Sequence, residues 1–464
     1  MKFRLNHQLV WACLLLAGLS FSCKDDDVDP EKGVNEWIFE NMNLYYYWND
    51  KIPERPNMNL QPEQFFNSLL NTYDQATNPE GDRFSFIVDD AEALLASING
   101  ESKSTGMEVR WYLDQDGVSV FGQVLYTESG APAENAGLQR GDFVIKIDGQ
   151  SLNKNNVFDL FGQDAFSLTK AQGEFDENGD LIGLQNEETV NLTSVVWQTN
   201  PVYTHKIFTE GGRKIGYFLY NQFIPGPHGS KDKQYDQAMD QVFAEFKSRG
   251  VEELVVDLRY NPGGAQTSAN NLASLIAKGV DGNSILMRQE YNDNLEQALK
   301  DEYGEDFFID KFQVKEENIG DQLNRVYFLV SGNSASASEL VINCLKPYMT
   351  VILVGETTYG KNVGSITIKD ESQKIKWGMQ PIIVKTYNSA GDSDYTAGFA
   401  PNPGMEVTEG PQLHPFGSLE DPLLAKAVYS IVNSPARVQE PKNAPKQWGT
   451  TIERKRVSLR ELSL

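Results

Sequence analysis

The sequence predicts an α/β protein that also carries a β-rich domain and a small helical domain near its N-terminus. Strand-like and helix-like segments alternate from residue 214 to residue 355, which is the rhythm of an α/β domain. A mixed apolar strand with a tight turn, Phe143–Gly149, marks the region before it as β-rich. At 464 residues, 40% of them hydrophobic, the chain is long enough for two or three domains with cores of their own.

Residues 34–95 are predicted to form the helical domain. Large apolar side chains fill residues 34–49, and residues 62–73 add a second helical stretch. The aromatic side chains of the first stretch favour a packed structural face, and a carbohydrate-binding patch is the alternative. Asp82–Phe86 closes this domain before the β-rich region, which spans residues 96–200.

Residues 201–433 are predicted to form the α/β domain. Lys214–Leu219 has the pattern of a strand, and Tyr235–Arg249 that of a helix with its apolar side chains on one side. Asp421–Val428 is expected to be the closing helix. The last segment, residues 434–464, is locally basic, and we expect it to be exposed and flexible, with no assigned role.

A serine at position 336 lies between an apolar strand, Val326–Val330, and an apolar helix, Leu340–Leu345. The small residues around Ser336 would let a substrate backbone come close. The helix that begins there points free N–H groups back at the serine, where negative charge could be stabilised. This is how a nucleophile is usually presented.

A serine hydroxyl needs a base within hydrogen-bond reach. No histidine of this chain has the setting of a base, since His228 lies in a Gly/Pro loop and His414 precedes a proline. Lys361 follows a buried-looking strand, Val351–Val354, and burial lowers the pKa of a lysine because it disfavours the ammonium form. The alternative is that Ser336 only begins a helix and that Lys361 is a surface lysine.

A glycine-rich turn, Asp257–Gly264, follows the strand Leu254–Val256 and precedes a helix. Gly263 and Gly264 leave backbone amides open at this turn, and such amides form oxyanion holes. Pro-Gly-Gly is also ordinary turn chemistry, so the motif alone does not decide between a site and a loop.

Together these residues closely resemble the carboxyl-terminal processing peptidases, the tail-specific serine protease family. The resemblance implies a crotonase-like peptidase core in which Ser336 attacks the scissile carbonyl and Lys361 takes its proton and later gives it to the leaving amine. The amides of Gly263 or Gly264 and of Ala337 would then hold the oxyanion.

The resemblance also assigns supporting roles and shows one departure. Glu339 would be a supporting polar residue beside the nucleophile. Many members place Gln or Glu four residues beyond the lysine to orient it, whereas this chain has Ser365. A serine can donate or accept a hydrogen bond, but it is shorter.

The segment Gly130–Asp142 resembles the PDZ domain that this family usually carries before the catalytic domain. A PDZ domain adds an extended peptide to a sheet edge and receives the terminal carboxylate in a glycine-containing loop. The resemblance places that loop at Thr105, Gly106, Met107 and Glu108. A second glycine is common where Glu108 stands, and an inward carboxylate would repel a peptide's C-terminus. The alternative is a PDZ-like module that only packs against the catalytic domain.

The first residues resemble a lipoprotein signal peptide. Two basic residues precede an apolar run, Leu9–Leu19, which is too short to span a bilayer permanently, and small residues then lead to Cys23. Cleavage after residue 22 would leave Cys23 for lipidation, followed by an acidic tether over residues 23–33. We therefore expect an extracytoplasmic protein, lipid-anchored in the bacterial cell envelope at the outer membrane. The acidic run is compatible either with display on the surface or with a plain solvated tether.

Charge and cysteine usage exclude several classes. A net charge of −24 would repel the phosphate backbone of nucleic acid. Removal of the leader leaves only Cys23 and Cys344, so no disulfide framework is available, and Cys344 is expected to be a buried small residue. No Cys or His cluster has metal-ligand spacing, so we expect no metal and no cofactor.

The favoured function is that of a serine endopeptidase with a Ser/Lys dyad, acting on protein or peptide substrates that the PDZ domain engages or gates. The resemblance covers residues from about 35 to 433. One alternative is a catalytically inactive PDZ scaffold that binds peptides, which the Ser365 departure supports. The other is a different hydrolase on a crotonase-like core, for instance one acting on an acyl thioester. The oligomeric state stays open.

Overall fold

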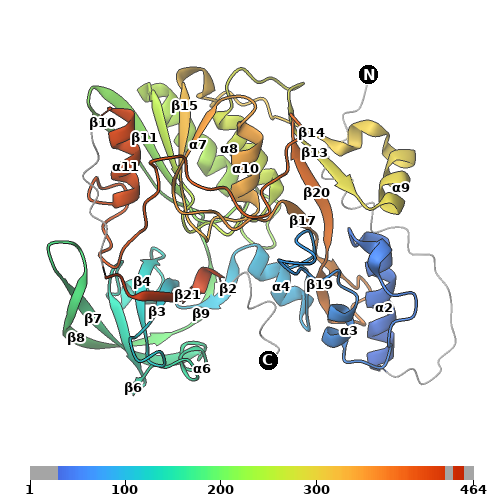
Figure 1. Cartoon of the computed structure of the whole chain (residues 1–464), viewed down its shortest axis with the longest axis horizontal. Coiled ribbons are helices and arrows are strands. Elements are labelled where there is room, and N and C mark those ends of the chain that lie inside the picture. Colours follow the sequence, from blue (N-terminus) through green and yellow to red (C-terminus); the bar gives the residue numbers. More distant parts are fainter. Residues whose placement is uncertain (1–29, 434–442, 454–464) are drawn as a thin grey trace.

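The computed structural model describes residues 30–433 and 443–453. Its centre is a five-stranded sheet in the order β10-β11-β12-β15-β16 (Figure 1). Strands β11 to β16 of this sheet pair in parallel, and β10 is antiparallel to β11. The strands are β10 (Val202–Glu210), β11 (Arg213–Tyr220), β12 (Glu253–Asp257), β15 (Arg325–Val330) and β16 (Thr350–Gly355). The inner strands are near-continuous apolar runs because both of their faces are covered.

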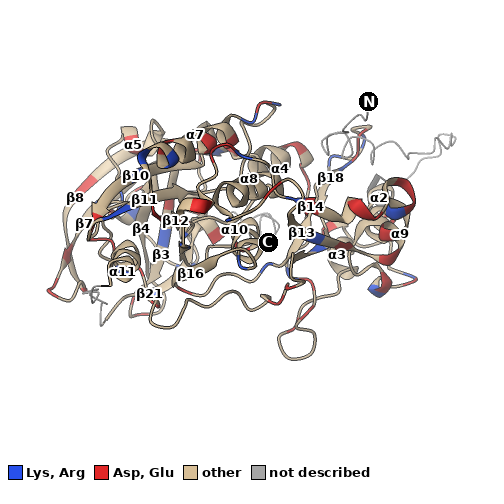
Figure 2. Cartoon of the chain, turned by 90° about the horizontal axis from the view of Figure 1, so that it is seen from above, with Lys and Arg blue, Asp and Glu red and all other residues tan. Residues whose placement is uncertain are grey.

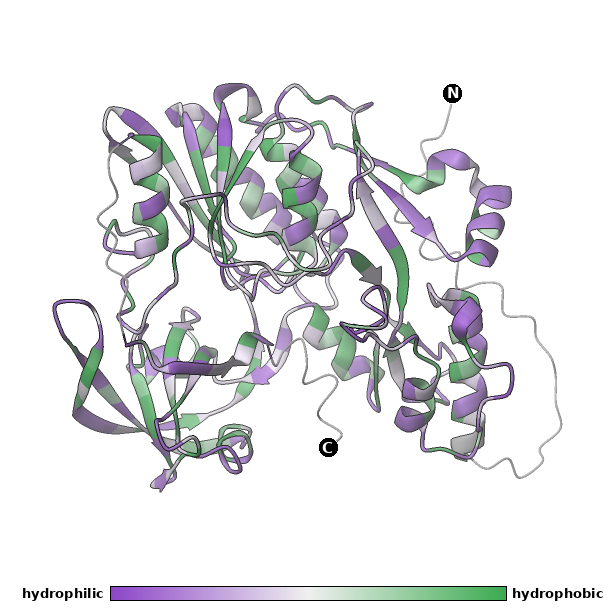
Figure 3. Cartoon of the chain, viewed as in Figure 1, coloured by the Kyte–Doolittle hydropathy of each residue, from purple (hydrophilic) through white to green (hydrophobic). Residues whose placement is uncertain are grey.

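Helices cover both faces of this sheet. On one face lie α7 (Gln234–Arg249), α8 (Gln266–Ile276) and α10 (Ala337–Leu345), and on the other lies α11 (Pro422–Ile431). Figure 3 shows these helices green on one side and purple on the other. The core on the first face includes Phe218, Val256 and Phe328, and alternate residues of the same strands, such as Tyr217 and Val255, point to α11. The predicted α/β core is confirmed.

A second sheet borders the core in the order β14-β13-β20-β17. Its strands are β14 (Ile309–Lys311), β13 (Ile285–Tyr291), β20 (Ile382–Asn388) and β17 (Val363–Ser365). The helices α9 (Asp293–Tyr303) and η2 (Glu305–Phe308) accompany it, whereas η3 (Gly320–Gln322) lies against the end of α8. This sheet carries the residues that follow Lys361 and so forms one wall of the site described below.

The N-terminal region is helical, as predicted, but its core is completed by strands from a later part of the chain. Its helices are α2 (Pro30–Tyr45), η1 (Asn49–Lys51), α3 (Pro62–Ser68) and α4 (Ala91–Ile98). Strand β1 (Phe86–Val88) pairs with β19 (Gly378–Gln380), which pairs with β18 (Ile368–Lys369). Ile368 and Met379 complete the core around Ile38 and Phe66. The local pattern marks an apolar face, but it cannot show which distant segment covers that face.

The β-rich domain is a sheet with two short helices (Figure 1). It comprises β3 (Met107–Leu113), β4 (Val120–Thr127), β5 (Phe143–Ile147), β6 (Gln150–Ser151), β7 (Ala165–Phe175), β8 (Leu181–Thr193), α5 (Pro132–Asn135) and α6 (Val157–Phe161). A ribbon of β2 (Glu101–Ser104) and β9 (Val195–Gln198) joins it to the rest. The predicted strand Phe143–Ile147 is confirmed, and its turn has positive φ at Asp148 and Gly149, as a type I′ hairpin requires.

Residues 443–453, which belong to the segment expected to be an exposed and flexible tail, pack against the folded domains in the structure. Strand β21 (Lys446–Thr450) pairs antiparallel with β3, and Ile452 is buried in the core beneath α11. Trp448 and Ile452 are the apolar side chains through which residues 443–453 pack against the rest of the protein. The predicted leader, the lipidation site Cys23 and the tether up to residue 29 lie outside the described residues.

Acidic residues outnumber basic residues, 65 to 41. Figure 2 shows red segments on α2, α7, α9 and β8, in line with the net charge of −24. Over residues 30–433 and 443–453 we find no helix that is long and apolar enough to cross a membrane.

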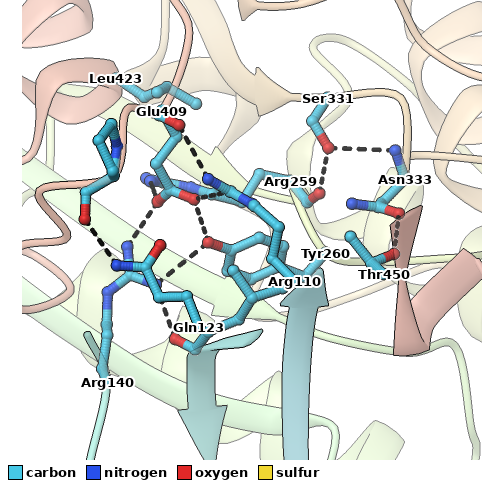
Figure 4. A network of polar contacts seen from close by, with 12 residues as sticks. Arg110, Gln123, Arg140, Arg259, Tyr260, Ser331, Asn333, Glu409, Leu423 and Thr450 are labelled. Atoms are coloured by element: carbon cyan, nitrogen blue, oxygen red, sulfur yellow. Dashed lines mark hydrogen bonds and ion pairs between the residues drawn. The ribbon is translucent and has the colours of Figure 1, made fainter. Parts of the chain in front are cut away.

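A buried carboxylate joins the β-rich domain to the α/β core (Figure 4). Glu409 accepts hydrogen bonds from Arg110 of β3 at 2.6 Å, from Arg140 at 2.5 Å and from Arg259 of the core at 2.8 Å. The Tyr260 hydroxyl donates to the same carboxylate. Burial disfavours the charged form of Glu409, but the three guanidinium groups outweigh it and hold the pKa of this carboxyl well below its usual value.

We expect Glu409→Gln to lower the free energy of unfolding by about 3–5 kcal/mol near neutral pH, because it leaves buried guanidinium groups without their carboxylate. Because the pKa of Glu409 is lowered in the folded state, its contribution is fully present above the unfolded value of about 4.3 and is lost as the pH falls below it. Urea unfolding from pH 7 down to pH 3 measures both effects.

The control is Glu420→Gln, whose side chain is 74% exposed and should tolerate the change. Equal unfolding free energies for the Glu409 variant and the parent at pH 7 would contradict this account of the interface.

Candidate active site

Ser336 stands at the turn between β15 and α10, as the sequence predicts. Its backbone has φ 54° and ψ −110°, in a region that residues other than glycine rarely adopt. The turn is held because Ser336 N–H donates to the Glu339 carboxylate at 2.9 Å and Ala335 N–H donates to the Asn261 carbonyl at 3.2 Å. This strained conformation places Ser336 in the wall of the central cleft.

Glu339 connects the nucleophile turn to the lysine loop. One of its carboxylate oxygens accepts from Ser336 N–H and, at 2.8 Å, from Lys361 N–H. The other accepts from Thr358 Oγ1 and from Gly360 N–H, both at 2.6 Å. The side chain is fully buried, and burial raises the pKa of Glu339 while these four donors oppose the shift.

Lys361 is half-buried and lines the same cleft as Ser336. Its ammonium nitrogen lies 5.4 Å from the centre of the Phe84 ring. Ser365, at the end of β17, lines the cleft as well. The structure therefore brings together the predicted nucleophile, the predicted base and the residue that departs from the family pattern.

Arg83 shapes the lysine loop from the N-terminal region. Its guanidinium donates to the carbonyls of Gly360 at 3.0 Å, Thr396 at 2.8 Å and Tyr359 at 3.3 Å. The sequence marks Asp82–Phe86 only as the end of the helical domain, so this role was missed. An arginine directly before Phe84, close to a domain boundary, is a signal that could have suggested it.

The glycine-rich turn offers one amide rather than two. Gly263 N–H donates to the Asn261 side chain at 2.9 Å. Phe223 N–H donates to Gly263 C=O, and Ala265 N–H donates to Phe223 C=O. These two bonds form a parallel bridge around Gly264 that does not use Gly264 N–H. The sequence leaves Gly263 and Gly264 open as candidates for the oxyanion amide, and these contacts favour Gly264.

The N–H of Ala337 is the second predicted candidate. Ala337 is the first residue of α10, and the first N–H groups of a helix have no partner inside it. Gly263 matters for its small size, because it lies directly against Ser336. A methyl group at Gly263 would come within 2.8 Å of both Ala335 O and Ser336 Cβ, and its φ is 103°.

These groups face a cleft of about 590 Å³. Its polar wall carries Ser336, Lys361, Gly264 and Ala337. Its apolar lining includes Phe223, Pro225, Leu295, Leu299, Ile366 and Ile383. Such a cleft has room for an extended chain with an apolar side chain beside Ser336, Lys361 and the two candidate amides. In the described part of the chain, no group of three or more His, Cys, Asp or Glu residues is placed to hold a metal.

The predicted peptide-binding loop lies elsewhere. Thr105, Gly106, Met107 and Glu108 stand at the start of β3, and none of them is among the residues that line the described cleft. Gly106 N–H donates to Ser104 Oγ at 2.9 Å, so this amide is already engaged. The Glu108 carboxylate accepts a hydrogen bond from the Thr451 hydroxyl of the C-terminal segment.

Comparison with known proteins agrees with this geometry. Residues 214–402 match the profile of peptidase family S41, and residues 33–86 match the peptidase S41 N-terminal domain. The chloroplastic C-terminal processing peptidase of Tetradesmus obliquus is 26% identical over 286 residues, which are 58% of this chain and 54% of the relative. The carboxyl-terminal-processing protease of a Picosynechococcus species is 26% identical over 333 residues, 68% of this chain and 70% of the relative.

A solved structure shows the same fold. A crystal structure described as an S41 protease from Bacteroides fragilis superposes with a TM-score of 0.70 at 24% identity, over 89% of this chain and 99% of that chain. The fold and these matches define the class of protein as a serine-type peptidase. The chain belongs to peptidase family S41, and the predicted likeness to the carboxyl-terminal processing peptidases is confirmed. It spans 54% and 70% of the lengths of the two curated relatives above.

We expect Gly263→Ala to reduce proteolysis by about a hundredfold, the loss typical of a damaged oxyanion hole, because the added methyl group would collide with the nucleophile turn. The measurement is the rate of cleavage of an unfolded protein, with thermal unfolding to show that the variant is folded. Gly332→Ala, on the same turn as Ser336 and with nothing within 4 Å of an added methyl group, should retain the parent rate. A fully active Gly263→Ala variant would contradict the close approach.

Proposed function

We propose that the chain is a serine endopeptidase that hydrolyses peptide bonds of extracytoplasmic proteins or peptides with a Ser336/Lys361 dyad. The observation that carries the proposal is the pair of hydrogen bonds from Ser336 N–H and Lys361 N–H to one carboxylate, that of Glu339. A single buried anion thereby ties the nucleophile turn to the base loop at the wall of one cleft. An inactive scaffold would have no need of this arrangement.

In the proposed mechanism, Ser336 Oγ attacks the scissile carbonyl carbon while neutral Lys361 Nζ takes the hydroxyl proton. The negative charge that develops on the carbonyl oxygen is stabilised by the N–H groups of Gly264 and Ala337. Collapse of the tetrahedral intermediate breaks the peptide bond, and Lys361 gives its proton to the leaving amine. Water, deprotonated by Lys361, then hydrolyses the acyl ester and restores Ser336.

The lysine in this proposal is oriented through its backbone. Glu339 fixes the Lys361 N–H, Arg83 holds the carbonyls of the two preceding residues, and Phe84 packs beside the ammonium group. A long side chain at position 365 is then not required. This arrangement supports catalysis in spite of Ser365, the departure on which the scaffold alternative depends.

We further assign the β-rich domain as a PDZ-like domain that engages or gates the substrate. Strand β3 lies beside α6, the arrangement into which PDZ domains insert an extended peptide. The domain is also bound to the glycine-rich turn, because Arg110 and Arg140 share the Glu409 carboxylate with Arg259. Removal of residues 101–195 should change the cleavage kinetics if the domain gates the site.

We also propose that the mature chain is lipid-anchored at Cys23 in the cell envelope. The apolar run Leu9–Leu19 and the small residues before Cys23 support this assignment. Wild-type protein should incorporate labelled palmitate in cells and sediment with membranes, and Cys23→Ser should do neither. Unchanged labelling of the variant would refute the anchor.

Substitution of the dyad tests the function directly. We expect Ser336→Ala and Lys361→Ala each to reduce cleavage of an unfolded protein by about three orders of magnitude or more, because each removes a group that acts in the reaction. Products are sized by mass spectrometry, and a serine-reactive fluorophosphonate should label the parent and not the Ser336 variant.

Ser372→Ala and Lys374→Ala are the matched controls, since both side chains belong to exposed residues of a nearby loop. Full activity in either dyad variant would refute the proposed mechanism. A parent chain that binds peptides and cleaves nothing would favour the scaffold.

A further inference from the structure

The edge of the β-rich domain is covered by the chain's own C-terminal segment. The sheet order is β21-β3-β4-β5-β7-β8, so β3 would be an open edge without β21. The two strands are antiparallel, with Lys446 opposite Leu113 and Thr450 opposite Arg110. In Figure 1, β21 is the red strand that lies along β3, between the β-rich domain and the α/β core. An open edge of this kind would attract another extended segment.

A tryptophan anchors β21 in the groove between β3 and α6. The Trp448 ring stacks on Phe158 of α6, with centroids 5.2 Å apart and planes at 28°. Phe158 in turn contacts Trp111 of β3 edge-on at 6.3 Å. Trp448 therefore fills the space in which a domain of this kind takes the side chain of a bound peptide.

The loop at the start of β3 contacts an internal residue rather than a chain end. Thr451 Oγ1 accepts from Val109 N–H at 2.9 Å and donates to the Glu108 carboxylate. Gly106 N–H is engaged by Ser104. A terminal carboxylate in this place would face the carboxylate of Glu108, whereas a hydroxyl can satisfy it. The chemistry of the loop therefore suits an internal segment that carries a hydrogen-bond donor.

The other side of β21 contacts the catalytic domain. Thr450 Oγ1 donates to the Asn333 side chain at 3.1 Å (Figure 4). Ile452 is 2% exposed and belongs to the core that α11 covers. Asn333 belongs to the turn that leads to Ser336. The segment thus joins the peptide groove to the nucleophile turn.

We propose that the β3 edge is a binding site for an internal extended peptide and that the chain's own residues 443–453 are its resident ligand, which a substrate polypeptide displaces. The inference rests on the proposed function only in calling the competing polypeptide a substrate. The binding site itself is argued from the β3–β21 pairing, the Trp448 stack and the Glu108–Thr451 contact.

A tethered ligand competes strongly. The effective concentration of a segment on a short linker is on the order of millimolar. The apparent affinity for an added peptide equals the intrinsic affinity multiplied by the fraction of molecules in which the groove is open. Weakening the resident strand should therefore tighten the binding of an added copy by about tenfold or more.

The test uses the full chain with Ser336→Ala, so that binding is measured without cleavage and its outcome is independent of the proposed proteolysis. The probe is a fluorescent, C-terminally amidated peptide copying residues 443–453, followed by fluorescence polarisation. Trp448→Ala in the protein should bind the probe about tenfold more tightly than the parent. Gln447→Ala, an exposed neighbour on the same strand, should bind it as the parent does.

The second measurement uses a reversible disulfide that holds β21 against β3. Lys446→Cys with Leu113→Cys places two cysteines directly opposite each other in the antiparallel pair, where a disulfide can form. The oxidised protein should not bind the probe, and reduction should restore binding. Equal probe binding in the oxidised and reduced states, or equal binding by the parent and Trp448→Ala, would overturn the proposal.

The same assay tests the preference for an internal segment. A probe ending at Thr451 with a free carboxylate should bind no better than its amide, because Glu108 faces that position. Tighter binding of the free acid would overturn this part of the proposal.

Discussion

The geometry of the candidate active site depends on the hydrogen bonds that the buried Glu339 carboxylate accepts. An ionised carboxylate without partners in a protein interior is very unfavourable, so its burial requires donors in fixed positions. Four donors meet this requirement, one from the nucleophile turn and three from the segment Thr358–Lys361. Two segments that are separate in the sequence must therefore adopt one relative geometry, and that geometry places both Ser336 and Lys361 at the cleft. The strained φ of Ser336 persists because its N–H is one of these donors.

Serine hydroxyls join the nucleophile turn to the glycine-rich turn in the same way. Ser331 Oγ donates to the Arg259 carbonyl at 2.5 Å, Ser334 Oγ to the Leu258 carbonyl at 2.8 Å and Ser338 Oγ to the Asn261 carbonyl at 3.0 Å. The run of small residues around Ser336 therefore does more than admit a substrate. It fixes the position of Ser336 relative to the glycine-rich turn, and the buried Arg259 supports this arrangement through its ion pairs with Asp257 and Asp421.

The central strands and the nucleophile turn could be predicted because their signals are local, as at Val326–Val330 and Ser336. The choice between Gly263 and Gly264 could not, because it depends on which amide the Asn261 side chain engages. Arg83 was missed since its acceptors lie 276 to 313 residues away. Strand β21 was predicted as part of a tail because the segment around it is polar and locally basic, and because its partner strand β3 lies in a distant part of the sequence. A local pattern shows what a segment can bury, and only the tertiary structure shows against what.

Three connections join other parts of the chain to the α/β core, and the strength of each connection limits how the site can be regulated. The N-terminal region contributes Arg83, whose neutral carbonyl acceptors could be exchanged for water at modest free energy. The β-rich domain is bound through Glu409, and swinging it away as a whole would leave a buried carboxylate without two of its three guanidinium partners, at several kcal/mol. Displacement of β21 leaves that network intact, because the strand's contacts are backbone pairing, a ring stack and single hydroxyl bonds. Regulation through the groove is therefore far less demanding than regulation by moving the whole domain, and its effect would reach the nucleophile turn through Thr450 and Asn333.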